Sequence, residues 1–348
     1  ERFAADFESI NELRKPKKIK QDLGKVAVVG SGPAGLSVAG DVAKLGYEVT
    51  VFEGQSEPGG VLLFGIPEFR LSKAVVRREI ARLEGLGVKF VCNTFIGQDK
   101  TLDDLFAEGY DSIFIGTGTH IPQDVRMEND EVPGVFQAMY LLTNVQLVEN
   151  GELDENQIPV KKGDRVIIIG GGNVAMDAAR TCVRLGCKSV TVAYRRSQEQ
   201  MPALLSEYEE ARAEGVQFQW FASPVGVEGT DKVEGFKYEV MALNEDGAGI
   251  HGTGNFQVMP VDKIIIAAGH KPNARLVGEG NNLKVDEKGY IITSEDPYGM
   301  TNRDGVFAGG DVVHKPATVV LAMREAKKAV DGMVKYMEIK KAQESANQ

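Results

Sequence analysis

Glycines recur at the spacing G-x-G-x-x-G in residues 30–35, between an apolar run at 25–29 and an amphipathic stretch. This spacing allows a tight turn, close approach of a pyrophosphate to the backbone and close packing of a helix on a strand, and the helix N-terminus favours negative charge. Glu53 ends the next apolar run, 18 positions after Gly35, where a carboxylate can accept hydrogen bonds from ribose hydroxyls. The pattern predicts a dinucleotide site with the candidate residues Gly30, Gly32, Pro33, Ala34, Gly35 and Glu53.

A second glycine-rich segment, Gly-Gly-Gly-Asn-Val-Ala at residues 170–175, follows another apolar run and opens another amphipathic stretch. It is the G-x-G-x-x-A variant of the same pattern. The apolar run that follows ends in TVAYRR, which we interpret as placing Arg195 and Arg196 where the first unit has Glu53. Guanidinium groups pair well with a phosphate that a carboxylate would repel, so NADPH is favoured over NADH; two solvated arginines are the alternative. The candidate residues are Gly170, Gly171, Gly172, Asn173, Val174, Ala175, Arg195 and Arg196.

A third motif, Gly309-Gly310-Asp311, follows an apolar run and precedes Ala317 and Thr318 at the expected start of a helix over 317–336. The acid could hydrogen-bond ligand hydroxyls, and the helix N-terminus could favour negative charge on a ligand. Gly-Gly-Asp is also a common turn, so the motif indicates a ligand site only in combination with the other motifs.

The order apolar run, glycine turn, amphipathic stretch, apolar run occurs twice and predicts two βαβ units, that is, a duplicated dinucleotide-binding fold. A helix is expected over 135–151, strands over 216–260, and a boundary near 128–133. We therefore expect an α/β protein with two nested Rossmann-like domains. Their predicted limits are an N-terminal arm at 1–23, a first domain at 24–128 plus 297–348, and a second domain with its linker helix at 129–296.

Composition excludes several functions. The formal net charge is −10, without the basic footprint of a nucleic-acid-binding protein, and no apolar run reaches the length of a membrane span. The N-terminal residues lack the apolar core of a signal peptide, and three cysteines suit a reducing, cytoplasmic compartment. Three cysteines provide neither a disulfide framework nor the four thiolates of a common iron–sulfur cluster, and the histidines lack zinc-ligand spacing.

Two further patterns have ordinary interpretations. Cys182 and Cys187 have four residues between them, unlike a redox C-x-x-C pair, and packing is the expected role. Four glutamates of one expected helix are interpreted as a single solvated face, namely Glu207, Glu209, Glu210 and Glu214.

In combination, GSGPAG, Glu53, PGGVLLFGIPEFRLSK, GTGTH, GGGNVAMDAAR, YRRSQEQMPA, AAGHKPN and GVFAGGDVV resemble the flavoproteins with two dinucleotide-binding domains, which have a glutathione-reductase-like fold. Residues 59–73 and 194–203 most resemble the small (beta) subunit of NADPH-dependent glutamate synthase. The large subunit of NADH-dependent ferredoxin:NADP oxidoreductase and the N-terminal half of dihydropyrimidine dehydrogenase are similar too.

The resemblance implies FAD across the first and third motifs and NADPH at the second, with backbone of residues 60–70 around the flavin. An ordinary loop that enters a helix is the alternative for this last segment. The resemblance adds the cofactor-binding candidates Gly59, Gly60, Leu63, Arg70, Gly116, Thr117, Gly118, Ala268 and Gly269.

The implied activity is hydride transfer between NADPH and FAD, in which the cofactors carry the chemistry and no side-chain catalyst is required. The relatives usually carry an N-terminal iron–sulfur domain, and this chain begins with ERFAADF, which resembles the segment just after it. An iron–sulfur partner subunit or domain is therefore expected, the glutamate synthase large subunit being one such partner. The alternatives are a disulfide reductase of thioredoxin-reductase type and a non-catalytic, dinucleotide-binding scaffold subunit of a larger redox complex.

Overall fold

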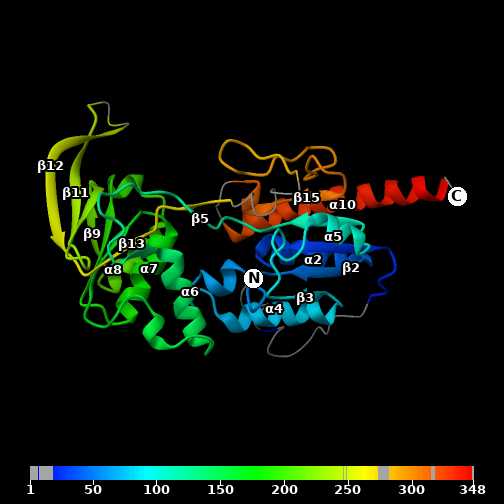
Figure 1. Ribbon diagram of the computed structural model, residues 1–348, viewed down its shortest axis with the longest axis horizontal. Helices are drawn as coiled ribbons and strands as arrows, with labels where there is room; N and C mark the ends of the chain where they lie inside the picture. The colour runs from blue at the N-terminus through cyan, green and yellow to red at the C-terminus, as the bar shows by residue number, and fades with distance from the viewer. Residues whose placement is uncertain are drawn as a thin grey trace. The chain divides into compact units, whose positions relative to one another are not determined.

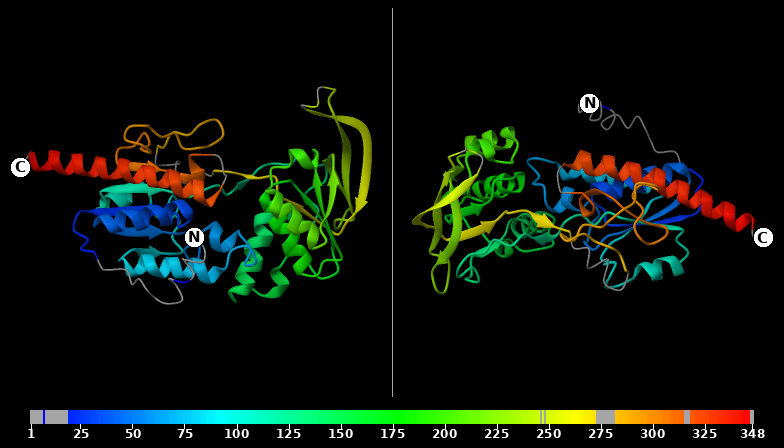
Figure 2. Two further views of the ribbon diagram at one scale, coloured as in Figure 1. Left: turned by 180° about the vertical axis from the view of Figure 1, so that it is seen from behind. Right: turned by 90° about the horizontal axis from the view of Figure 1, so that it is seen from above.

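The computed structural model describes residues 7, 19–245, 247, 249–272, 282–314 and 318–346. The chain forms two compact units, each a sheet flanked by helices (Figure 1). Unit 1 comprises Glu1–Leu63, Leu71–Ile121 and Lys271–Gln348, and unit 2 comprises Phe64–Arg70 and Pro122–His270. Unit 1 consists of three separate stretches of the chain, which Figure 2 shows in blue, in cyan, and in orange to red.

Unit 1 is built on a five-stranded parallel sheet with the strand order β15-β4-β1-β2-β3. The two central strands are buried from Val26 to Val29 and from Ser112 to Ile115 and consist mainly of apolar residues, as expected for a parallel sheet covered on both faces. The strands are β1 (Lys25–Val29), β2 (Glu48–Phe52), β3 (Lys89–Val91), β4 (Ser112–Ile115) and β15 (Val306–Ala308). The helices are α2 (Pro33–Leu45), α3 (Val61–Phe64), α4 (Lys73–Gly85), α5 (Leu102–Ala107), η3 (Gly310–Val312) and α10 (Val319–Ala346). The last residue of α3, Phe64, belongs to unit 2.

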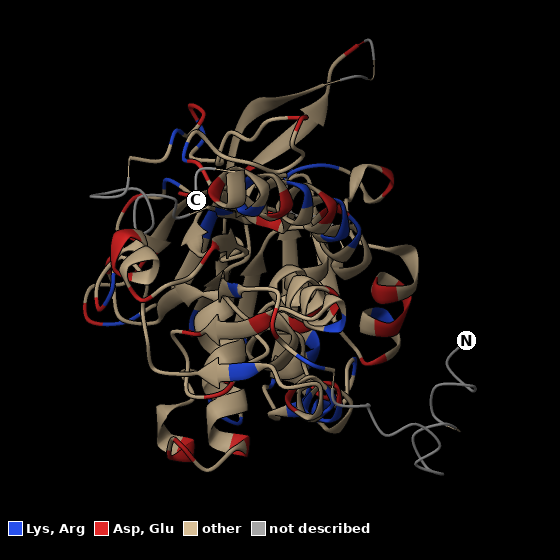
Figure 3. Cartoon of the chain, turned by 90° about the vertical axis from the view of Figure 1, so that its right-hand side faces the viewer, with Lys and Arg blue, Asp and Glu red and all other residues tan. Residues whose placement is uncertain are grey.

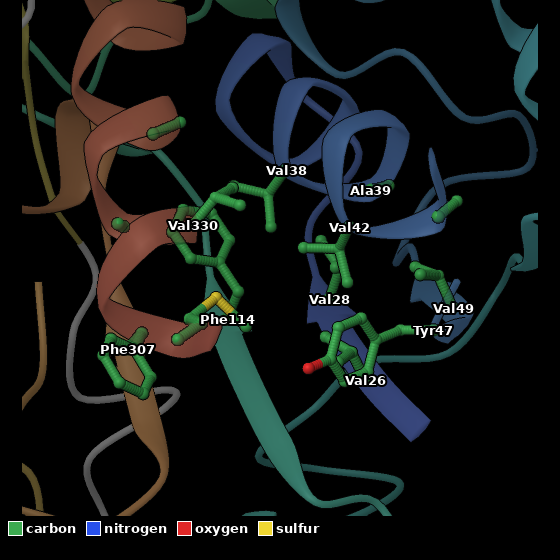
Figure 4. Packing of buried hydrophobic residues seen from close by; sticks show 14 of the residues in the cluster. Val26, Val28, Val38, Ala39, Val42, Tyr47, Val49, Phe114, Phe307 and Val330 are labelled. Carbon is green, nitrogen blue, oxygen red and sulfur yellow. The ribbon is translucent and has the colours of Figure 1, made fainter. Parts of the chain in front are cut away.

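The main core of unit 1 lies between the sheet and the helices α2 and α10. Val26 and Val28 of β1 pack with Val38 and Val42 of α2 and with Val330 of α10 (Figure 4). The helix predicted to follow the third motif is thus α10, which extends beyond the expected end at 336 to Ala346. This packing holds α2 on one face of the sheet, so that the loop opening the helix lies at the carboxyl end of β1.

Unit 2 repeats the arrangement with the parallel order β6-β13-β7-β8-β9 and adds an antiparallel sheet, β10-β11-β12. The strands are β6 (Val135–Gln137), β7 (Arg165–Ile169), β8 (Ser189–Tyr194), β9 (Gln217–Trp220), β10 (Ala222–Glu228), β11 (Gly235–Leu243), β12 (Ile250–Pro260) and β13 (Lys263–Ile266). The helices are α6 (Ala138–Glu149), η1 (Glu155–Gln157), α7 (Asn173–Arg184), η2 (Gln198–Gln200) and α8 (Leu205–Ala213). A small two-stranded sheet contains β5 (Ile121–Pro122) and β14 (His270–Lys271).

Within residues 24–348, the limits of the two units differ from the predicted domain limits at three places. The chain enters unit 2 after Ile121, because residues 122–128 already bond within that unit: the amide of Gln123 donates to Gly269 and that of Glu128 to Val225. The return to unit 1 comes at Lys271, well before residue 297. Residues 64–70, expected in the first domain, belong to unit 2.

Among the described residues, acidic and basic residues are interspersed along helices and loops (Figure 3). In the same part of the chain, no helix has the length and apolar character needed to cross a membrane.

Candidate functional site

The three glycines of the first motif have separate structural roles. Gly30 has φ +93°, and its amide donates to the carbonyl of Phe52 at 2.8 Å. Gly35 lies in the first turn of α2, where an added Cβ would collide with the Gly30 carbonyl oxygen. Gly32 is the N-cap residue of α2, and an added Cβ there would meet no atom within 4 Å. Open space therefore lies at a helix N-terminus, where a pyrophosphate can approach the backbone.

Glu53 follows β2 directly and is buried, with 8% of its surface exposed. Its carboxylate accepts hydrogen bonds from the Ser31 amide at 3.0 Å, from the Ser31 hydroxyl, and from the Gln55 amide at 2.9 Å. The Ser31 hydroxyl oxygen accepts in turn from the Gly59 amide at 2.8 Å. Gly60 (φ +52°) lies so close to the motif that its Cβ would stand 2.9 Å from the Gly32 Cα. Glu53 and residues 59–60 are thus assembled around the first motif.

The segments after β4 and β15 reach the same helix terminus. The Gly116 amide donates to Val29 at 2.8 Å, and an added Cβ at Gly116 would stand 3.2 Å from the Gly35 nitrogen. A Cβ at Gly310 (φ +74°) would stand 2.7 Å from the Cβ of Ala34. Unit 1 therefore brings together most of its predicted site residues. Thr117 and Gly118 follow Gly116, and Pro33 and Leu63 lie in the first turn of α2 and in α3.

Asp311 lies beside a cavity of about 270 Å³ between η3 and α10. Burial raises the pKa of the Asp311 carboxyl above its usual value. Thr318 caps the first turn of α10 by accepting a hydrogen bond from the Leu321 amide at 3.2 Å. Ala317 lies outside the described residues. The cavity lining is Gly310, Asp311, His314, Leu321, Ala322, Arg324 and Glu325; the last five carried no motif that would have singled them out.

The second motif repeats the glycine geometry in unit 2. Gly170 has φ +146°, and an added Cβ would collide with the Ala267 carbonyl oxygen. Gly172 is the N-cap of α7 and again faces space with no atom within 4 Å of an added Cβ. Ala175 is fully buried in the core of the unit. A second open helix N-terminus is therefore available to a phosphate group.

The register of the strands corrects one sequence assignment. β1 and β2 pair Val29 with Phe52, and β7 and β8 pair Ile169 with Ala193. Tyr194, not Arg195, therefore stands at the position of Glu53. The aromatic ring is accommodated because Gly171 has no side chain: an added Cβ there would stand 2.6 Å from the Tyr194 ring.

Arg195 and Arg196 follow Tyr194 and are both exposed. The loop beyond them folds back onto the glycine loop through two backbone donors. The Ala203 amide donates to the Gly171 carbonyl at 3.0 Å, and the Leu204 amide donates to Oδ1 of Asn173 at 3.0 Å. This loop closure is a feature that glycine spacing alone could not reveal. Of the remaining predicted residues, Val174 lies in the first turn of α7, and Ala268 and Gly269 follow β13.

Arg70 has partners within unit 2. Its guanidinium pairs with Asp177 of α7 and with Glu207 of α8. A contact between Arg70 and a flavin stays a prediction. Burial raises the pKa of Asp177 to about 6, against the opposing effect of Arg70.

The predicted solvated glutamate face of α8 was wrong for two of its four members. Glu207 pairs with Arg70, and Glu214 lies 2.7 Å from Arg180, whose side chain is buried. Glu210 is more exposed but also pairs with Arg180, at 2.6 Å. Glu207 and Glu210 of α8, and Glu214 directly after the helix, therefore pair with Arg70 or with Arg180 of α7 inside unit 2.

Comparison with known proteins places these sites in a family. Residues 24–326 match the pyridine nucleotide-disulphide oxidoreductase family. The small chain of NADPH glutamate synthase from Escherichia coli is 38% identical over 332 residues, which cover 92% of this chain and 70% of that one. The beta subunit of the NADP(+)-dependent formate dehydrogenase of Moorella thermoacetica is 36% identical over 90% of this chain and 44% of its own length.

Solved structures show the same fold. FprA from Mycobacterium tuberculosis in complex with NADPH superimposes with a TM-score of 0.75 at 19% identity, covering 93% of this chain and 86% of that one. Thioredoxin reductase of Lactococcus lactis gives 0.69 at 24% identity, covering 90% and 99%. The predicted glutathione-reductase-like α/β fold is confirmed. The chain therefore belongs to the pyridine nucleotide-disulphide oxidoreductase family, as a relative of the glutamate synthase small chains.

Proposed function

We propose that this chain is an FAD-dependent NADPH oxidoreductase in which unit 1 binds FAD and unit 2 binds NADPH. The observation that carries the proposal is the pair of open helix N-termini at Gly32 and Gly172, each preceded by a glycine turn with positive φ. When bound, the flavin and the nicotinamide supply the hydride chemistry. The residues of the chain bind and orient these groups.

The residue at the position of Glu53 distinguishes the two sites. Glu53 keeps its position by accepting protein hydrogen bonds on both oxygens, and an ionised carboxylate retains lone pairs for ribose hydroxyls. A carboxylate at this place repels a 2′-phosphate, which FAD does not have. In unit 2 the equivalent position is Tyr194, followed by the exposed Arg195 and Arg196. Two guanidinium groups without a competing carboxylate support NADPH as the ligand of unit 2.

We further propose that the electrons are exchanged with an iron–sulfur partner subunit or domain. The names of two relatives support a multi-subunit setting, since one is the small chain of a glutamate synthase and the other the beta subunit of a formate dehydrogenase. The chain has three cysteines, one fewer than a four-thiolate cluster requires. The glutamate synthase large subunit is one partner of the proposed kind.

An anaerobic absorbance titration tests the hydride half-reaction. The full chain, reconstituted with FAD, is titrated with NADPH and separately with NADH while the flavin band is followed. We expect one equivalent of NADPH to bleach the flavin, with NADPH preferred over NADH. A bound flavin that stays oxidised would favour a scaffold role, and a folded chain that takes up no flavin would contradict the proposal.

The partner is tested separately by adding a [2Fe–2S] ferredoxin as the acceptor to the flavin-loaded chain with NADPH. Reduction of the ferredoxin, seen as loss of its visible absorbance, supports one-electron transfer to an iron–sulfur centre. Rapid reduction of ferricyanide without reduction of the ferredoxin would support the oxidoreductase activity but contradict an iron–sulfur protein as the electron acceptor.

A further inference from the structure

Cys182 and Cys187 are brought together by the way α7 ends. The helix closes at Arg184, and Gly186, with φ +81°, turns the chain back. The Gly186 amide donates to the Val183 carbonyl at 3.0 Å, and the Cys187 amide donates to the Cys182 carbonyl at 3.2 Å. These two bonds define a Schellman motif, whose first and last residues pack their side chains against each other. In this chain those two residues are the cysteines: Cys182 belongs to the buried core cluster of unit 2, and the partly buried Cys187 packs against that cluster.

The two thiols have unequal surroundings. Cys182 is fully buried, whereas Cys187 is half-buried and its sulfur lies 3.7 Å from the Lys161 carbonyl oxygen. A hydrogen bond from the Cys182 thiol stabilises the Cys187 thiolate and lowers the pKa of Cys187, against the opposing effects of burial and of Asp164. The same hydrogen bond and burial raise the pKa of Cys182 well above its usual value. The half-buried Cys187 sulfur is therefore the better nucleophile, and the buried Cys182 thiol is its hydrogen-bond partner.

The backbone geometry suits a covalent link. A disulfide spans Cα atoms about 4.4–6.8 Å apart. The direct amide-to-carbonyl bond between residues 187 and 182 holds their backbones close together, without any unwinding of α7. The four intervening residues form the turn that these two backbone hydrogen bonds close.

We propose that Cys182 and Cys187 form a reversible intrachain disulfide when the protein meets a hydroperoxide. The Cys187 thiolate attacks the outer peroxide oxygen, the O–O bond breaks, and an alcohol or water leaves, so that Cys187 becomes a sulfenic acid. The Cys182 sulfur then attacks the Cys187 sulfur; its proton and the sulfenic hydroxyl leave as water. Two thiols are oxidised by two electrons, and one peroxide bond is reduced. An external dithiol reverses the link by exchange.

The sequence around the pair provides a direct test. Trypsin cleaves after Arg180, Arg184 and Lys188, which releases Thr-Cys-Val-Arg and Leu-Gly-Cys-Lys as separate peptides. After treatment of the full chain with hydrogen peroxide and alkylation of free thiols, we expect one ion with the joined mass of the two peptides minus two hydrogens. Dithiothreitol should remove it. Thiol titration in denaturant should fall from three to one, with Cys92 remaining.

Variants separate the two sulfurs. In Cys187→Ser, the buried Cys182 should stay reduced, so that two thiols remain. In Cys182→Ala, Cys187 should stop at a sulfenic acid that dimedone traps, with no loss of two hydrogens. Cys92→Ser is the control and should still give the joined peptides. If Cys182→Ala fails to fold, the tryptic peptide map of the wild-type chain still tests whether the disulfide forms. Both peptides recovered as free thiols, oxygen added to Cys187 without a link, or a Cys187–Cys187 link between chains would each overturn the proposal.

Discussion

The guanidinium of Arg70 donates from Nη1 to both carboxylate oxygens of Asp177, at 2.8 and 2.9 Å. Its other terminal nitrogen, Nη2, lies 2.9 Å from Glu207, so one side chain links α7 to α8. The preceding residue, Phe69, has its ring 4.5 Å from the guanidinium of Arg180 and 4.3 Å from that of Arg184. Cation–π contacts and ion pairs therefore hold residues 69 and 70 on unit 2.

The buried Asp177 gives stability a measurable pH dependence. Its pKa is raised from 3.8 to about 6 in the folded chain, so between these values the folded state binds a proton that the unfolded state does not. The free energy of unfolding contributed by this group is then highest below about pH 4 and falls as pH rises through 6, by about 3 kcal/mol in all. Asp177→Asn should lack this fall. Urea unfolding curves across pH 4–8 would show it as a difference in slope, and Glu209→Gln, an exposed carboxylate on α8, is the matched control.

Substitution by alanine should lower FAD affinity at Gly32 but protein stability at Gly35. Gly32→Ala puts a methyl group into open space at a backbone conformation that alanine adopts, so the fold should be retained while FAD affinity falls at least about tenfold. Gly35→Ala forces a Cβ into the Gly30 carbonyl and should destabilise unit 1 by about 1–3 kcal/mol, despite alanine's better helix propensity. Thermal unfolding and flavin fluorescence distinguish the two outcomes. Equal loss of stability in both variants would reject the assigned role of Gly32.

Gly172→Ala addresses the second site alone. The added methyl meets no protein atom, so the chain should fold and keep its flavin. NADPH should bind at least about tenfold more weakly, because the methyl occupies the space that the pyrophosphate needs at the N-terminus of α7. Stopped-flow reduction of the flavin at increasing NADPH concentrations measures this dissociation constant. Unchanged NADPH affinity, with Gly32→Ala equally without effect on FAD, would show that the glycine loops do not carry the dinucleotides.

Replacement of both Arg195 and Arg196 by alanine should weaken NADPH binding by roughly 1–3 kcal/mol and spare NADH, because the lost interactions are charge-assisted hydrogen bonds to the 2′-phosphate. Both side chains are exposed, so stability should change little. Lys188→Ala, an exposed cation just before the same strand, controls for general charge. If the ratio of NADPH to NADH affinity stayed constant, the two arginines would have no part in discrimination.

Much of the fold and of the candidate site follows from local patterns in the sequence. The glycine spacings, the apolar strand runs and the acid after the second strand are read over fewer than about 30 residues, which is the length of a βαβ unit. Gly32, Gly35 and Glu53 accordingly have the structural surroundings expected of them. The long helix after Thr318 was found in the same way, from its amphipathic pattern.

The predictions that the structure corrects share one physical cause: the surroundings of these residues depend on partners that are distant in sequence. Tyr194 occupies the position that the sequence interpretation gave to Arg195. The pairing of β8 with β7, compared with the pairing of β2 with β1, decides which residue is equivalent to Glu53. Glu207 and Glu214 have the spacing of a solvated face, but Arg180, which lies 27 and 34 positions before them in sequence, pairs with both. Arg70 and Asp177 are 107 positions apart, and no local pattern links them.

The discontinuity of unit 1 has a consequence for biosynthesis. Its sheet lacks an edge strand until Val306–Ala308 has been made, and the α2 side of its core lacks cover until α10 follows. Unit 2, in contrast, is complete once residue 270 has left the ribosome. The second unit can therefore fold during translation, while the first waits with part of the core beside α2 uncovered. Chaperone capture of nascent chains should consequently concentrate on residues 25–115, released only when the last helix emerges.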